Sequence, residues 1–210
     1  MKTNFALSFL VAVFLQATFV NAQTAANKYA LDLNLINNEY RGDYGNGLWD
    51  FGSRFYPGGG LTLSRYLSPS FNLGLSGSYG NYGYYIDPVD NFTLRKFDAD
   101  LHLDYKFNNG YILSENAKLA PFLTLGVGLA TYNDNFRDPA LRYIDHVKQG
   151  ADFIVPVGAG LKYQISERFA LQYKYLYNFT SRDIRDENRG ASYAGYQSVA
   201  GNDGFGKHVL

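Results

Sequence analysis

The segment from Phe169 to Phe179 alternates large apolar residues with residues that are mostly small or polar. Side chains on a β-strand point to opposite faces in turn, so this segment has one apolar face and one largely polar face. About eleven residues is also the length that a tilted strand needs to cross the hydrocarbon layer of a membrane. The alternation therefore predicts a strand, and it makes a transmembrane β-barrel the first hypothesis for the chain.

The preceding segment, 153–163, repeats this alternation and is joined to the first by residues 164–168. The link is too short for a helical crossover, so we expect two antiparallel neighbours. Pro156 contradicts the strand locally, because proline has no backbone N–H to donate. We expect a bulge at Pro156, or a hydrogen-bond pattern that spares its nitrogen.

The same alternation recurs along the chain and divides it into strands. The further strands are expected at about 29–37, 59–67, 71–79, 97–107 and 123–130, with a stub of an eighth at 204–210. The predicted outward, lipid-facing side chains are Leu31, Leu33, Leu35, Leu73, Leu75, Leu101, Leu103, Tyr105, Leu123, Leu125, Val127, Val155, Val157, Leu161, Leu171, Tyr173, Tyr175 and Tyr177.

Long and shorter connections alternate between these strands. The long loops are predicted at 38–57, 81–94, 133–149 and 180–202. Because successive strands run in opposite directions, all long loops emerge at one end, as in outer-membrane barrels, whose short turns face the periplasm. The sequence thus predicts an all-β fold: an eight-stranded antiparallel up-and-down transmembrane β-barrel, with a periplasmic N-terminus and an incomplete last strand.

Charged residues lie on the opposite, inward face of the predicted strands. Eight-stranded barrels are filled by their own side chains, and charges buried there must be paired, so we expect a structural ion-pair network. Its predicted members are Asp32, Asp98, Asp100, His102, Asp104, Lys106, Lys162 and Lys174. A metal or acid–base cluster is the alternative, but same-face residues of one strand stand about 7 Å apart, which is long for shared ligands. We predict no metal site and no cofactor.

An enzymatic barrel, such as a lipid A deacylase or acyltransferase, needs a nucleophile beside a base and an orienting carboxylate. The chain has three imidazoles, those of His102, His146 and His208, and the sequence places no serine beside any of them. We therefore predict no catalytic residues. The 19 basic and 19 acidic residues balance, which argues against a nucleic-acid partner.

The first 22 residues have the pattern of a secretory signal peptide. Lys2 is followed by an apolar run from Phe5 to Leu15, and Val20–Asn21–Ala22 supplies a cleavage motif. We predict a signal peptide at 1–22 and one barrel domain at 23–210. The chain has no cysteine, which excludes a lipoprotein anchor and disulfides.

Several strings of the chain resemble a known family. They are Gly42–Gly47, Leu63–Leu67, Tyr105–Ile112, Val155–Tyr163, Leu171–Tyr177 and the ending Asn202–His208. Together they look like the N-terminal β-barrel of the outer membrane protein A family as it occurs in Bacteroidota. The resemblance implies an integral outer-membrane barrel with a structural, envelope-integrity role.

Members of that family complete the eighth strand and commonly continue into a peptidoglycan-binding domain, whereas this chain stops at Leu210. An unclosed barrel would leave backbone edges that lipid cannot satisfy, so we expect the sequence to be a fragment of a longer protein.

The predicted function is that of a monomeric barrel in outer-membrane lipid, with its long loops at the cell surface. A surface adhesin or other binding protein acting through those loops is the first alternative, and a narrow pore is the second. A soluble ligand-binding barrel, with its apolar ladders turned inward, is the third, because alternation alone does not say which face is outside.

Overall fold

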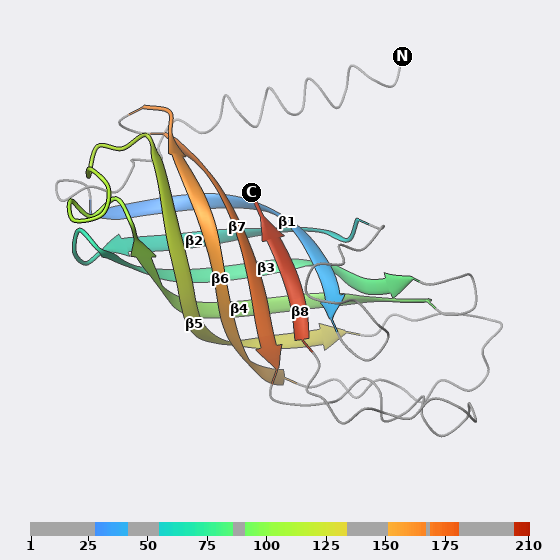
Figure 1. Ribbon diagram of the computed structural model, residues 1–210. Helices are drawn as coiled ribbons and strands as arrows, with labels where there is room; N and C mark the ends of the chain where they lie inside the picture. Colours follow the sequence, from blue (N-terminus) through green and yellow to red (C-terminus); the bar gives the residue numbers. More distant parts are fainter. Residues whose placement is uncertain (1–27, 42–54, 86–90, 134–150, 167–168, 181–203) are drawn as a thin grey trace, which may run out of the picture.

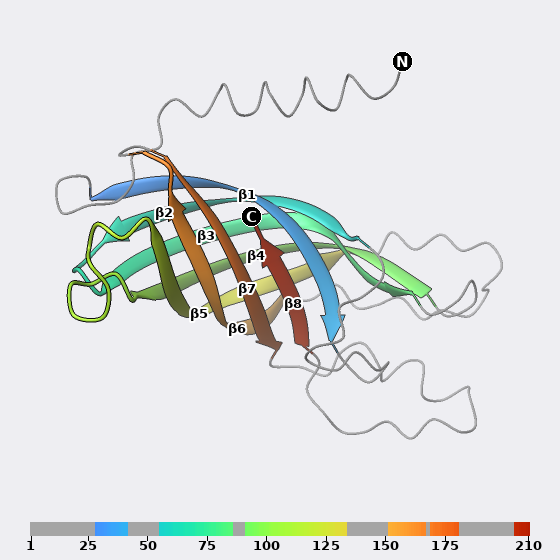
Figure 2. The same cartoon turned by 45° about the horizontal axis from the view of Figure 1, so that its top comes forward.

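The computed structural model describes residues 28–41, 55–85, 91–133, 151–166, 169–180 and 204–210. Each of its eight strands is antiparallel to the next, and β8 pairs with β1, so the sheet closes into a barrel (Figures 1 and 2). The strands are β1 (Tyr29–Arg41), β2 (Pro57–Tyr66), β3 (Phe71–Tyr85), β4 (Asn91–Lys106), β5 (Leu119–Asn133), β6 (Ala151–Gln164), β7 (Ala170–Thr180) and β8 (Gly204–Val209). The predicted eight-stranded antiparallel barrel is confirmed.

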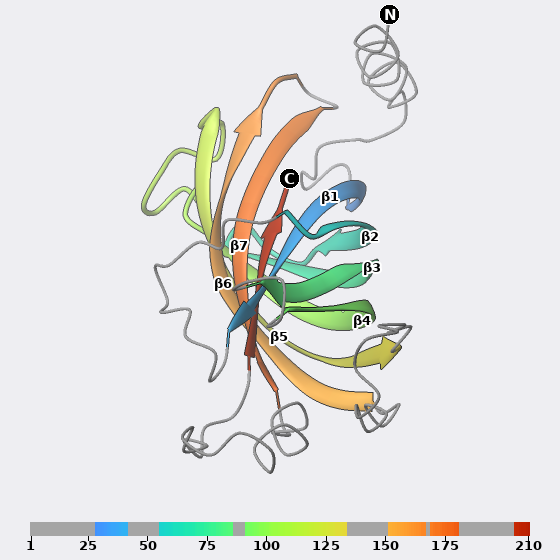
Figure 3. The ribbon, with the colours of Figure 1, turned by 90° about the vertical axis from the view of Figure 1, so that its right-hand side faces the viewer.

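The strands are tilted because the sheet closes with a stagger. Cross-strand partners followed around the barrel from Glu39 on β1, through β8 and on to β2, lead back to Tyr29, which lies ten residues earlier on β1. Closure with such a stagger requires strands inclined by roughly 35–45° to the barrel axis. The end-on view in Figure 3 shows the resulting ring of strands.

Several strands run further than the sequence predicted. β3 continues to Tyr85 and β4 begins at Asn91. The prediction of a loop at 81–94 is therefore wrong for most of its length, because residues 81–85 pair with residues 91–95 as strands. β1 likewise extends to Arg41 and shortens the expected loop 38–57. Backbone pairing does not need apolar side chains, so the ladder of large residues marks only part of each strand.

Most of what remains of the four predicted long loops, namely residues 42–54, 86–90, 134–149 and 181–202, lies outside the described residues. So do residues 1–22, the predicted signal peptide. Among the residues that the structure does describe, no helix has the length and apolar character needed to cross a membrane.

β8 is short, yet it pairs on both sides. Its residues face Ile36–Arg41 of β1 and Lys174–Phe179 of β7. Beyond its end, Leu35 and Leu210 exchange two backbone hydrogen bonds of 2.8 and 2.9 Å. β8 therefore closes the sheet along this part of the seam, although it is a short last strand of six residues, as the sequence predicted.

Pro156 interrupts a ladder without a bulge. β5 and β6 pair from Leu119 to Leu125 and again from Gly128 to Thr131, with the same register on both sides of the gap. No extra residue is inserted, so the expected bulge is absent, and the interruption falls where Val155 and Pro156 face β5. The β7 side of Pro156 keeps its pairing with Asn178.

Candidate functional site: an apolar wall around a filled polar interior

The outer wall of the barrel carries the side chains that the sequence predicted to face outward. Of the eighteen, Leu73, Tyr105, Val155, Tyr175 and Tyr177 are half-buried by their neighbours on the wall, and the other thirteen are exposed. Leu35 and Leu125, for example, expose 63% and 60% of their surface. Large apolar residues gathered on the outside reverse the usual arrangement of a soluble protein. The alternative in which the apolar ladders turn inward is therefore wrong.

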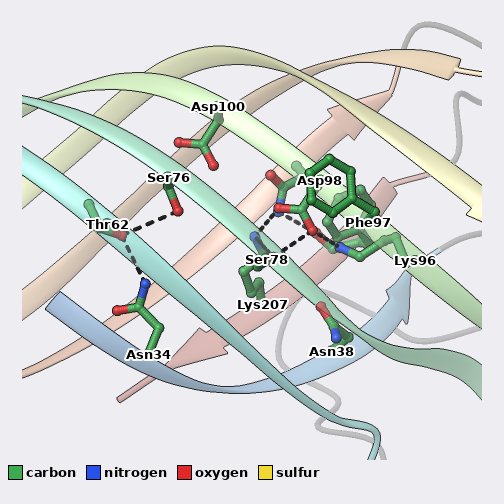
Figure 4. Close-up of polar contacts among 12 residues, drawn as sticks. Asn34, Asn38, Thr62, Ser76, Ser78, Lys96, Phe97, Asp98, Asp100 and Lys207 are labelled. Carbon is green, nitrogen blue, oxygen red and sulfur yellow. Dashed lines mark hydrogen bonds and ion pairs between the residues drawn. The ribbon is translucent and has the colours of Figure 1, made fainter.

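The interior contains a buried ion triad of Lys96, Asp98 and Lys207 (Figure 4). The Lys96 ammonium lies 3.0 Å from one carboxylate oxygen of Asp98, and Lys207 pairs with the other. Ser78 completes the group: its hydroxyl donates to Asp98 at 2.8 Å and accepts from Lys207 at 3.0 Å. Since Lys207 lies on β8 while its partners lie on β3 and β4, this contact crosses the interior.

An aromatic plug lies next to the triad. The Tyr82 ring centroid is 6.1 Å from that of Tyr132 and 5.8 Å from that of Phe205, and all three side chains are buried. The Lys96 ammonium sits 3.3 Å from the centroid of the Phe205 ring. Such a cation–π contact stabilises an ammonium that has left water. The three rings therefore fill the interior beside the triad.

Nearer the short turns, the inward residues Asp100, His102 and Asp104 of β4 make a few close contacts and not one continuous network. His102 Nδ1 lies 2.6 Å from Asp100, while its Nε2 is 3.9 Å from Asp104. The Thr124 hydroxyl donates to Asp104 at 2.6 Å, and Asp32 accepts from a serine of β2 at 3.3 Å. In the described part of the chain, no three His, Asp or Glu side chains converge in a way that could hold a metal ion.

Glycines make room for the His102 side chain. A Cβ atom on Gly74 of β3 or Gly126 of β5 would lie within contact distance of His102. Next to this row, Asn34 donates to the Thr62 hydroxyl at 2.8 Å, and Thr62 donates to Ser76 at 3.3 Å (Figure 4). The interior is thus filled by side chains with mutual hydrogen bonds, as a narrow barrel requires.

The predicted lysine partners of the network are placed differently from the expectation. Lys174 is buried and Lys162 half-buried, and their charges act on Asp32 without an ion pair within 4 Å among the described residues. The Lys106 ammonium lies 4.4 Å from the centroid of the Tyr66 ring. The predicted residues do not form one continuous network of close ion pairs.

The sequence interpretation missed Lys96, Lys207 and the plug. Lys96 stands two residues before Asp98 and so shares its face of the strand. Extending the predicted strand from residue 97 toward its N-terminal side would have placed Lys96 on the inward face. Tyr82 lay in a predicted loop. Lys207 and Phe205 lie in a strand of six residues, which is too short for alternation alone to show which residues face inward.

A polar cluster lies on the outer wall at the seam where β7, β8 and β1 meet. The Tyr173 hydroxyl and His208 Nδ1 are 2.7 Å apart, and His208 Nε2 lies 3.3 Å from Glu39. The His208 ring lies 4.8 Å, centroid to centroid, from that of Tyr175. Gly206 carries no side chain that would displace the Tyr175 hydroxyl, so the tyrosine can lean across β8. The cluster ties the shortest strand to both neighbours.

Fold and site together define a closed eight-stranded antiparallel barrel with an apolar outer wall and a filled polar interior. No protein-family model and no curated protein matches the chain. Among solved structures, the crystal structure of Neisserial surface protein A is similar, with 13% identity and a TM-score of 0.48 over 86% of this chain and 92% of that one. So is that of Ail, the attachment invasion locus protein of Yersinia pestis, solved in complex with the heparin analogue sucrose octasulfate, with 12% identity and a TM-score of 0.46 over 87% of this chain and 94% of that one. Membership of the barrel class follows from the strand pairing itself, and the resemblance to the outer membrane protein A family stays a prediction.

Proposed function

We propose that this chain is an integral outer-membrane β-barrel with a structural role in the envelope. In this proposal the barrel is monomeric, and its N-terminus and short turns face the periplasm. The observation that carries it is the distribution of polarity: large apolar side chains cover the outer wall, while Lys96, Asp98, His102 and Lys207 are buried inside. A closed barrel satisfies its own backbone, which is the condition for spanning a bilayer with strands.

Aromatic residues at both ends of the wall support this proposal. Phe71 and Tyr105 pair across β3 and β4 near the short turns, with ring centroids 5.4 Å apart. Tyr79 and Phe97 pair across the same two strands further along, and both are exposed. Between these pairs the wall is formed by four leucines and by the small pair Gly77 and Ala99. An apolar band flanked by aromatic girdles is typical of outer-membrane barrels, since aromatic rings favour the membrane–water interface.

The filled interior favours a structural role over a pore. Lys207 reaches from β8 to β3 and β4, and the plug packs beside it. An ion would have to displace paired charges and aromatic rings in order to pass. We therefore expect little steady conductance in planar bilayers, and a stable conductance would favour the pore instead.

The proposed role is also not enzymatic. The polar contacts of the His102 side chain in the described structure are to the carboxylates of Asp100 and Asp104, and neither is an activated nucleophile of the kind that a deacylase uses. His208 lies between Tyr173 and Glu39 in the seam cluster of the outer wall, which in this proposal faces lipid and not a substrate cavity. His146 lies outside the described residues.

The test is to express the chain in a Gram-negative host and examine its membrane fraction on a detergent gel, boiled and unboiled. We expect a band that migrates faster without boiling and that stays with the membrane after a carbonate wash. The boiled half of each sample is the control for unfolded mobility. A soluble periplasmic protein without a mobility shift would contradict the proposal.

A further inference from the structure

The connection between β4 and β5 presents three consecutive apolar side chains at its tip. Tyr111 exposes 90% of its surface, Ile112 55% and Leu113 38%. Most exposed apolar residues of this protein lie on strands of the outer wall, whereas these three lie in a turn beyond it. Adjacent exposed apolar residues of this size mark an interaction surface.

The tip is held in one conformation by its own hydrogen bonds. The side-chain oxygen of Asn109, which is buried, accepts from the backbone N–H of Tyr111 at 3.0 Å and of Ile112 at 3.1 Å. Gly110 has a φ of 82°, a conformation that favours glycine. The Leu113 N–H donates to the Phe107 carbonyl at 3.0 Å and closes the turn. The apolar tip is therefore preorganised, which lowers the entropic cost of binding.

The connection also points in a particular direction. In the end-on view of Figure 3 it lies outside the ring of strands, beside the start of β5, and not across the barrel mouth. In Figure 1 it lies at the same end as the turn between β2 and β3. The connection is therefore placed beside the wall, and it leads into β5 at Leu119, which is itself exposed.

We infer that Tyr111, Ile112 and Leu113 form an anchor that inserts into the periplasmic leaflet of the membrane around the barrel. This inference rests on the proposed function, because it continues the apolar wall laterally from β4 and β5 into the lipid. A tyrosine suits this depth, since its ring is apolar and its hydroxyl reaches the headgroups. Because the tip continues the apolar wall, we expect it to contact lipid and not a protein partner.

The experiment places a tryptophan reporter at the tip of the full chain. Trp49, the one tryptophan of the sequence, is first replaced by phenylalanine. Tyr111→Trp is then compared with Leu101→Trp in the middle of the wall and with Asn116→Trp, an exposed polar position of the same connection. Each variant is refolded into phosphatidylcholine vesicles with plain or brominated acyl chains, and its emission is recorded.

We expect brominated lipid to reduce the emission of Tyr111→Trp and Leu101→Trp, with a blue shift for both, and to leave Asn116→Trp unchanged. Quenching of Leu101→Trp alone would overturn the anchor while leaving the barrel in the membrane. Equal quenching of Tyr111→Trp and Asn116→Trp would overturn the assignment to the apolar tip. An unquenched Leu101→Trp would instead contradict the proposed function itself.

Discussion

Replacing Asp98 with asparagine should strongly destabilise the barrel. Asp98 is the single carboxylate of the buried triad, where it pairs with Lys96 and Lys207. All three side chains are no more than 2% exposed, so water cannot compensate for a lost charge. Asp98→Asn keeps the shape of the side chain but leaves two buried ammonium groups facing a neutral amide.

The expected magnitude follows from the charges of the triad. The native group carries two positive charges and one negative, Asp98→Asn leaves two positive charges, and Lys207→Met leaves one balanced pair. Removing one partner of a buried ion pair typically costs about 3–5 kcal/mol, which we expect for Asp98→Asn. Lys207→Met should cost less, about 1–3 kcal/mol, because it leaves Asp98 and Lys96 as a balanced pair. Its cost comes mainly from the lost hydrogen bond between Lys207 and Ser78. The double variant should cost less than the sum of the two.

The measurement is urea unfolding of the refolded chain in phospholipid vesicles, followed by far-ultraviolet circular dichroism and by the gel shift. Folding and unfolding branches must coincide for free energies to be compared. Two results would refute the reasoning. One is Lys207→Met destabilising as much as Asp98→Asn, and the other is a double variant that is additive within about 0.5 kcal/mol, as independent sites are.

Three further predictions use the same unfolding assay. Gly74→Ala should cost about 1–3 kcal/mol, since its methyl group would overlap the imidazole of His102. Gly77→Ala, with open space around its Cβ, is the control and should change the stability by no more than about 0.5 kcal/mol. Equal effects of the two substitutions would contradict the close contact between Gly74 and His102. Tyr173→Phe should cost about 0.5–1.5 kcal/mol through loss of its 2.7 Å hydrogen bond at the seam, and an unchanged midpoint would show that this bond adds nothing. Leu101→Lys in mid-wall should cost about 2–4 kcal/mol, but Leu119→Lys at the edge of the wall only about 0–1 kcal/mol; the reverse order would place the bilayer elsewhere.

The sequence predicted the faces of the strands well because period-two alternation is a local property. Once Leu101 and Leu103 are assigned to one face, Asp100 and His102 must lie on the other, whatever the neighbouring strands do. The antiparallel order follows from short links such as 67–70, which allow no crossover. These two local arguments are sufficient for the barrel and for its division into wall and interior.

Contacts across the interior depend instead on the stagger of the closed sheet, which no single strand reveals. Asp98 meets Lys207 because β8 stands opposite β3 and β4 at that height. The alternation places Lys162 and Lys174 on the inward face correctly, but it cannot say that they lie too far from Asp32 for a close ion pair. Partners on different strands were therefore predicted by charge alone, and the pairing of Asp98 with Lys96 and Lys207 was missed.

The short strand β8 shows why such cross-barrel contacts matter for closure. Its six residues offer few backbone pairs, and two of its glycines leave room for tyrosines of β7. Phe205 and Lys207 point inward to the plug and the triad, while His208 points outward to the seam cluster. Each of these three side chains is held by residues from other strands. β8 thus adds these side-chain contacts to its backbone pairing with β1 and β7, so the interior triad and the outer seam cluster both stabilise the closure of the barrel.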